Sequence, residues 1–143
     1  MRLVDVNVLV AAFRDAAPGH KVCRNLVVEM VDGPLPYGVS ELVLSGFLRV
    51  VTNPRVFDPP APLEAALAFA DAYRGGDAAV VVGPGPRHWP IFSVLCRSAR
   101  AKGNLVPDAY LAALAIESGC EWVTADRDYG RFPDLRWTLI DLA

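Results

Sequence analysis

The chain has 143 residues and is 53% hydrophobic, so it is long and apolar enough to bury the core of one domain. Its formal net charge of −2 argues against broad nonspecific binding to nucleic acid, which requires excess positive charge, but leaves room for a local basic rim. No apolar run approaches the roughly 18–20 residues that a membrane span needs, and the start Met-Arg-Leu-Val-Asp enters a strand pattern directly, unlike a signal peptide. We therefore expect a cytoplasmic protein that does not associate with a membrane.

In the first half of the chain, short apolar segments alternate with helix-like segments. The predicted elements are strands at 2–6 and 35–37 and helices at 7–14, 18–31 and 41–52. Ser40 has the side chain of an N-cap for the third of these helices, and Asn53-Pro54 is a suitable end for it.

The second half continues the alternation. It contains predicted helices at 63–74 and 88–102, and a third helix that has Pro107 in its first turn and ends near Gly119. A short turn or helical segment is predicted around 127–131. The predicted strands of this half are at 79–82, 122–124 and 137–140. Strands that alternate with helices are typical of a parallel sheet covered on both faces. The sequence therefore predicts one domain over residues 1–143, with a three-layer α/β/α architecture and a central parallel sheet.

Four acidic side chains stand beside these apolar runs, each at the predicted end of a strand or start of a helix: Asp5, Glu41, Asp108 and Asp126. In parallel sheets, ligands bind beyond the carboxyl ends of the strands, so the predicted fold brings these carboxylates toward one edge. Carboxylates gathered in this way repel one another unless a divalent cation lies between them. Oxygen ligands without His or Cys favour Mg²⁺ or Mn²⁺ over zinc, and indicate metal-assisted hydrolysis of a phosphodiester.

Each acid also has a structural explanation. Glu41 and Asp108 are in first helical turns, where a negative charge complements the helix dipole by about 0.3–1 kcal/mol. Asp126 is equally well explained as a turn residue before Arg127-Asp128. Asp5, an acid inside a predicted buried strand, is the one that a structural role explains least well.

The cysteines and histidines offer little alternative chemistry. Cys23, Cys96 and Cys120 are widely spaced and form no Cys-x-x-Cys pair, so we expect reduced and mostly buried thiols. His20 and His88 are the only histidines and lie far apart in the sequence, which disfavours a nuclease that uses paired histidines as acid and base.

Four segments of the chain carry a family pattern. They are Asp5-Val-Asn-Val-Leu-Val-Ala-Ala-Phe, the stretch from Ser40-Glu41 to Thr52-Asn-Pro-Arg-Val-Phe57, Asn104-Leu-Val-Pro-Asp-Ala-Tyr-Leu-Ala-Ala-Leu-Ala, and Thr124-Ala-Asp-Arg-Asp-Tyr-Gly-Arg-Phe. In this order they resemble PIN-domain ribonucleases, and specifically VapC-type toxins of bacterial toxin–antitoxin pairs. The resemblance covers essentially the whole chain, although the 59–90 region carries few of the shared motifs.

The resemblance implies a set of site residues and a biological role. It implies metal-binding and catalytic roles for Asp5, Glu41, Asp108 and Asp126, and supporting roles for Asn7, Thr124 and Asp128. It implies a Mg²⁺- or Mn²⁺-dependent endoribonuclease that acts on structured RNA such as tRNA or rRNA. A cognate VapB-type antitoxin that blocks the site is the implied partner, and a homodimer the implied assembly.

Our mechanistic hypothesis divides the work among the acids. Asp5 and Asp108 bind the principal ion, Asp126 is a further ligand or acts through water, and Glu41 binds a second ion or orients the attacking water. Hydrolysis then leaves 5′-phosphate and 3′-hydroxyl ends, because no activation of the 2′-hydroxyl is invoked. The candidate phosphate contacts, which lie near these segments in sequence, are Arg14, Arg49, Arg55, Arg127 and Arg131.

Two other function classes stay open at this point. One is a different metal-dependent phosphoesterase, such as a DNA-directed nuclease or a phosphatase. A haloacid-dehalogenase-like phosphatase needs Asp-x-Asp after the first strand, whereas this chain has Asn7 at the second position. The other is a non-catalytic PIN-like protein that acts as a binding partner through its antitoxin complex, and the presence of all four acids argues against it.

Overall fold

The computed structural model describes residues 1–143 and contains strands and helices in regular alternation. Their order is β1 Arg2–Val4, α1 Val6–Phe13, α2 His20–Asp32, β2 Tyr37–Val39, α3 Glu41–Val51, α4 Leu63–Arg74, β3 Ala79–Val81, α5 His88–Ala99, α6 Leu105–Ser118, β4 Glu121–Thr124, the 3₁₀ helix η1 Arg127–Arg131, and β5 Trp137–Leu139. No helix is both long and apolar enough to cross a membrane.

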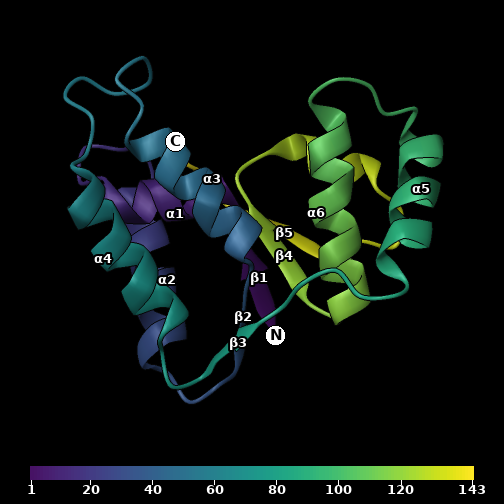
Figure 1. Ribbon diagram of the computed structural model, residues 1–143, viewed down its shortest axis with the longest axis horizontal. Coiled ribbons are helices and arrows are strands. Elements are labelled where there is room, and N and C mark those ends of the chain that lie inside the picture. The colour runs from purple at the N-terminus through teal and green to yellow at the C-terminus, as the bar shows by residue number, and fades with distance from the viewer.

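All strand pairs in the structure are parallel. β4 lies between β1 and β5, and β2 pairs with β3 in a separate ladder. The two ladders adjoin, since a Cβ atom added at Gly38 of β2 would lie 3.4 Å from the backbone oxygen of Arg2. Figure 1 shows α1 to α4 on one side of the strands and α5 and α6 on the other. This arrangement confirms the predicted three-layer α/β/α architecture.

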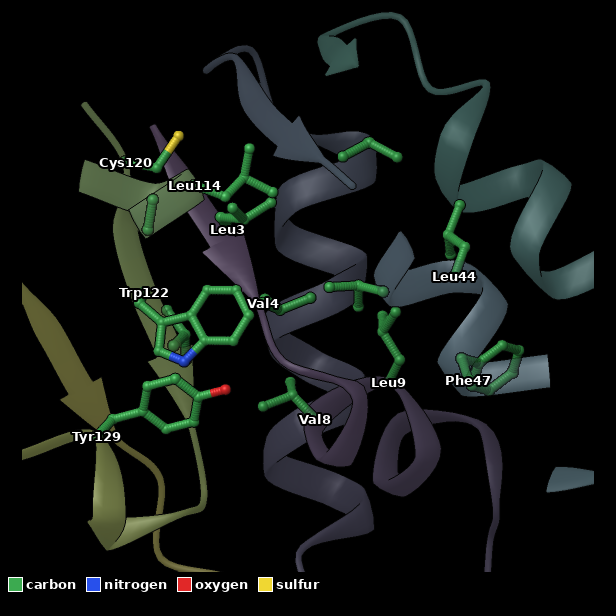
Figure 2. Close-up of a cluster of buried hydrophobic side chains, with 14 of the residues drawn as sticks. Leu3, Val4, Val8, Leu9, Leu44, Phe47, Leu114, Cys120, Trp122 and Tyr129 are labelled. Atoms are coloured by element: carbon green, nitrogen blue, oxygen red, sulfur yellow. The ribbon is translucent and has the colours of Figure 1, made fainter. Parts of the chain in front are cut away.

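The hydrophobic core joins the strands to both helical layers. Its 31 buried residues form one cluster, and they include every apolar residue of β1 and β4. In Figure 2 the side chain of Val4 on β1 lies between Trp122 of β4 and the α1 residues Val8 and Leu9. Because β1 and β4 are buried between helices, the loops that follow their carboxyl ends are held in fixed positions.

The predicted strand at 2–6 was wrong at its end, because β1 stops at Val4. Asp5 has an extended backbone, and its carboxylate accepts the Val6 N–H, so it is the N-cap of α1. The acid is therefore at a strand–helix junction and not inside the strand. This position points the carboxylate toward the carboxyl edge of the sheet.

Other predicted boundaries were also displaced: the helix predicted at 18–31 begins at His20, and two further shifts have identifiable reasons. The strand predicted at 35–37 lies at Tyr37–Val39, because Pro34 and Pro36 have no N–H to give to a ladder. The helix predicted to reach 102 ends at Ala99, where Arg100 adopts a left-handed conformation with φ of 49°. The predicted Ser40 cap is confirmed, since its hydroxyl accepts the Val43 N–H.

Candidate active site

Three of the four predicted acids line one pocket at the carboxyl edge of the sheet. Asp5 follows β1, Asp126 follows β4, and Asp108 lies in the first turn of α6. The pocket has a volume of about 610 Å³, and Asn7 lines it as well. The fold therefore brings together side chains that are more than 100 residues apart in the chain.

The Asp5 carboxylate is buried and held by three hydrogen bonds. One oxygen accepts the Val6 N–H at 2.7 Å, and the other accepts the Thr124 hydroxyl at 2.7 Å and the Asn7 amide at 3.3 Å. Burial raises the pKa of Asp5, these hydrogen bonds lower it, and the nearby charge of Asp126 raises it. The carboxylate is thus fixed in direction but electrostatically disfavoured.

Thr124 and Asn7 connect the β1–α1 junction to the β4–η1 junction. The Thr124 hydroxyl, which is completely buried, accepts the Asp126 N–H at 3.0 Å while it donates to Asp5. The Asn7 oxygen accepts the Ala125 N–H at 3.1 Å. These bonds position two of the acids relative to each other, which is a geometric basis for the supporting roles predicted for Asn7 and Thr124.

Asp108 is the acid most perturbed by its neighbours. Its carboxylate is half-buried, and burial together with the charges of Asp126 and Asp5 raises its pKa to about 6. The buried Tyr129 hydroxyl donates to it at 3.3 Å, which lowers the pKa and only partly offsets the other effects. The fold therefore holds the negative charge of Asp108 near those of Asp5 and Asp126 at a cost in stability.

Tyr129 is a site residue that the sequence did not reveal. Its ring packs against Trp122 with 5.3 Å between the ring centroids, and burial strongly raises the pKa of its hydroxyl. In Figure 2 the hydroxyl extends from the ring toward the side of Val8. It donates a hydrogen bond to Asp108. In the sequence Tyr129 looks like one more core aromatic, so its contact with an acid has no local signal.

Glu41 and Asp128 lie outside the pocket. The Glu41 side chain is 62% exposed and forms an ion pair with Arg74 at the end of α4, with 2.9 Å between the charged atoms. Asp128 is exposed and donates its backbone N–H to Asp126 at 2.9 Å, and its charge makes a small contribution to the raised pKa of Asp108. The structure therefore places three of the predicted acids in the lining of one pocket and leaves these two outside it.

Comparison with known proteins agrees with this arrangement. The PIN domain family matches residues 2–135 of the chain. Ribonuclease VapC25 of Mycobacterium tuberculosis is 41% identical over 136 residues, which cover 95% of this chain and 96% of that protein. VapC ribonuclease Mb2897 of Mycobacterium bovis is 43% identical over 137 residues, which cover 96% of this chain and 93% of that protein. The chain belongs to the PIN-domain family, among the VapC ribonucleases.

A solved structure supports the PIN fold independently. The crystal structure of VapBC2 from Rickettsia felis, bound to a DNA fragment from its promoter, contains a chain that superposes with a TM-score of 0.68. The match covers 96% of this chain and 97% of that one, at 16% sequence identity. At this identity the likeness supports the fold, and it confirms the fold class predicted from the sequence.

The donor set of this PIN pocket fits a hard divalent cation. Every candidate ligand is an oxygen, which suits Mg²⁺ or Mn²⁺. In their present positions no three Asp, Glu, His or Cys side chains converge closely enough to hold one ion. Mg²⁺ commonly uses only one or two carboxylates and keeps several waters, so two of these acids suffice. Burial, and after it the charges of Asp126 and Asp5, raise the pKa of Asp108, and a bound cation would favour its charged form.

A second pocket lies at the opposite edge of the PIN fold and lacks these properties. It has a volume of about 510 Å³ and is lined by the chain start and by Glu29, Glu121 and Arg136. Glu29 is neutralised by an ion pair with Arg2 at 3.1 Å. Because this pocket adjoins the amino ends of the strands, the acid-lined pocket is the better candidate for the active site.

Proposed function

We propose that the protein is a Mg²⁺- or Mn²⁺-dependent endoribonuclease that acts as the toxin of a toxin–antitoxin pair. The observation that carries the proposal is the convergence of Asp5, Asp108 and Asp126, from three separate parts of the chain, in one pocket. The VapC relatives, which are 41% and 43% identical and are named ribonucleases, support RNA as the substrate. Structured RNA such as tRNA or rRNA is the substrate class that we propose.

In this proposal the acids hold the cation and the polar network holds the acids. The cation would supply Lewis-acid activation of a phosphate and stabilisation of the negative charge that develops during hydrolysis. Asp5 and Asp108 would be its ligands, with Asp126 bound directly or through water. Thr124 fixes the orientation of Asp5, and Tyr129 fixes that of Asp108. The role of Glu41 in binding a second ion or orienting water stays a prediction.

The substitution Asp5→Asn tests the proposal while it keeps the size of the side chain, and a melting curve of the variant checks that it is folded, because the amide nitrogen cannot accept the hydrogen bonds of Thr124 and Asn7. Asparagine is as good an N-cap as aspartate, so α1 keeps its start while the pocket loses a charge. We expect cleavage of RNA in magnesium to fall by at least about 100-fold, because one ligand to the ion is weakened. Asp71→Asn, an exposed change on α4, is the matched control and should cleave at the wild-type rate. Undiminished cleavage by Asp5→Asn would remove the assignment.

The assay has two further arms that separate the candidate functions. A DNA oligonucleotide of the same sequence tests for a DNA-directed nuclease, and mapping of the product ends tests for 5′-phosphate and 3′-hydroxyl termini. Thermal unfolding with millimolar magnesium reports metal binding without activity, since a ligand that binds only the folded state raises the melting temperature. If magnesium did not change the melting temperature of either wild type or Asp71→Asn, the result would count against a metal site shared by the carboxylates.

We also propose an antitoxin partner, a homodimer and a cytoplasmic location. The apolar wall of the pocket, which includes Val10 and Val50, is suited to cover by an antitoxin segment. On α5, Trp89 and Val94 are 67% and 56% exposed, and a second copy of the chain would bury them.

The cysteines are all free, as in a reducing compartment. Sedimentation of the purified chain tests the dimer, and suppression of RNA cleavage by the protein encoded beside it tests the antitoxin.

A further inference from the structure

One cation shares the pocket with the three acids. Arg14 directly follows α1, and it is the only Lys, Arg or His residue that lines the pocket. The other arginines that the sequence offered as phosphate contacts are exposed and lie outside the pocket lining: Arg49, Arg55, Arg127 and Arg131. The structure thus singles out one of five candidates.

The Arg14 guanidinium has no carboxylate partner. The three ion pairs of the structure involve Arg2, His20 and Arg74, and the Arg14 side chain forms no hydrogen bond within the protein. The neighbouring acid, Asp15, is fully exposed and faces His20 at 3.4 Å. An arginine that lies near several carboxylates without pairing to any of them keeps its donors available for an outside ligand.

Phe57 holds this guanidinium in place. The guanidinium carbon lies 3.7 Å from the centre of the Phe57 ring, which is the geometry of a cation–π contact. The loop that carries Phe57 is itself folded, because the Phe57 N–H donates to the Asn53 backbone oxygen at 3.1 Å and the Asn53 side chain accepts the Arg55 N–H at 2.9 Å. Contact through the flat face leaves the edge donors of the guanidinium free, in a fork that matches two phosphate oxygens.

We propose that Arg14, held by Phe57, binds a phosphate of the RNA strand next to the one that is cleaved, and so positions the strand across the acids. The inference rests on the proposed ribonuclease function and adds a substrate-positioning residue to it. A chain with net charge −2 and three acids in its pocket repels a polyanion, so a fixed cation at the pocket wall offsets part of that repulsion where the strand enters.

Kinetics of RNA cleavage in magnesium test this role through the variants Arg14→Gln, Arg14→Lys and Phe57→Leu. Loss of a charged hydrogen bond to the bound strand should raise KM by about tenfold in Arg14→Gln with kcat within about twofold of wild type. Arg14→Lys keeps the charge and loses the fork, so its KM should be intermediate. Phe57→Leu frees the guanidinium and should raise KM by a few fold. Arg24→Gln, an exposed arginine on α2, removes the same charge away from the pocket and should match wild type.

Binding of a fluorescent single-stranded RNA in calcium, measured by anisotropy at several salt concentrations, gives a readout independent of turnover. One lost phosphate contact should reduce the slope of log K against log salt by about 0.7 in Arg14→Gln and leave it unchanged in Arg24→Gln. A lower melting temperature of Arg14→Gln with unchanged KM and slope would mean that the contact with Phe57 is only structural, and would overturn the inference. Failure of wild type to cleave structured RNA in magnesium would overturn the ribonuclease function as well.

Discussion

Replacement of Asp108 by asparagine should stabilise the metal-free protein at neutral pH. The carboxylate is half-buried beside Asp5 and Asp126, and its pKa rises from 3.8 to about 6. A shift of roughly 2 units corresponds to about 3 kcal/mol, and solvent screening of a half-buried group reduces this to about 1–2 kcal/mol. Asparagine removes the charge and still accepts the Tyr129 hydroxyl, so the gain should appear in full.

The pH dependence follows from the direction of the shift. Because the folded state binds the Asp108 proton more tightly than the unfolded state does, the stability that this proton contributes is fully present below about pH 4 and is lost as pH rises through about 6. Urea unfolding in EDTA, at intervals between pH 4 and 7.5, should therefore show an advantage of Asp108→Asn that is largest above pH 6 and shrinks toward pH 4. Asp71→Asn, on the exposed face of α4, should differ from wild type by no more than a few tenths of a kcal/mol.

Magnesium should change the relative stabilities of wild type and Asp108→Asn. Wild type gains stability from bound ion by mass action, whereas Asp108→Asn lacks a ligand and gains less, so the difference between them should narrow or reverse at millimolar magnesium. If Asp108→Asn in EDTA were less stable than wild type at pH 7, or if its advantage did not depend on pH, the argument that burial and the neighbouring acids disfavour the Asp108 charge would be refuted.

Two further substitutions test the frame around the site. Thr124→Val should lower the free energy of unfolding, measured by urea denaturation, by about 2 kcal/mol, because the Asp5 carboxylate loses a hydrogen-bond donor at 2.7 Å. Thr138→Val, on an exposed face, is the control and should lower it by less than about 0.5 kcal/mol. Gly46→Ala should destabilise the protein by about 1–3 kcal/mol, because the new Cβ would lie 2.9 Å from a Val6 methyl group. This is opposite to the usual stabilisation by alanine in a helix. An unchanged melting temperature would show that α1 and α3 can move apart at little cost.

Most of the fold was predictable because local signals set the elements. The helix expected at 63–74 is α4 with the same bounds, since a proline-rich loop precedes it and Gly75-Gly76 follows. The strand predicted at 35–37 was misplaced although part of its signal is local, since Pro34 and Pro36 have no N–H for a ladder. Its pairing is not local: the Tyr37 N–H donates to the Ala78 oxygen, far along the chain, and periodicity carries no information about that partner.

The candidate site was predictable in its acids and less so in their surroundings. Asp5 and Asp126 were placed at one edge by the rule that parallel strands end together, and Asp108 by its position in a first helical turn; all three line one pocket. Tyr129 and Phe57 were not found, because each contributes through a side chain on another element. Tyr129 is 21 residues from Asp108, and Phe57 is 43 residues from Arg14. Contacts between residues so far apart in the chain leave no spacing pattern in the sequence.

Glu41 shows how the same local signal can have different outcomes. It begins α3, just as Asp108 lies in the first turn of α6, and both positions face the carboxyl edge in the simple picture. Asp108 packs against η1 and joins the pocket, whereas Glu41 turns toward the end of α4 and pairs with Arg74. An exposed pair of this kind contributes less than about 1 kcal/mol. A doubly charged ion that reached this carboxylate would therefore displace Arg74 at little cost, and the role of Glu41 stays a prediction.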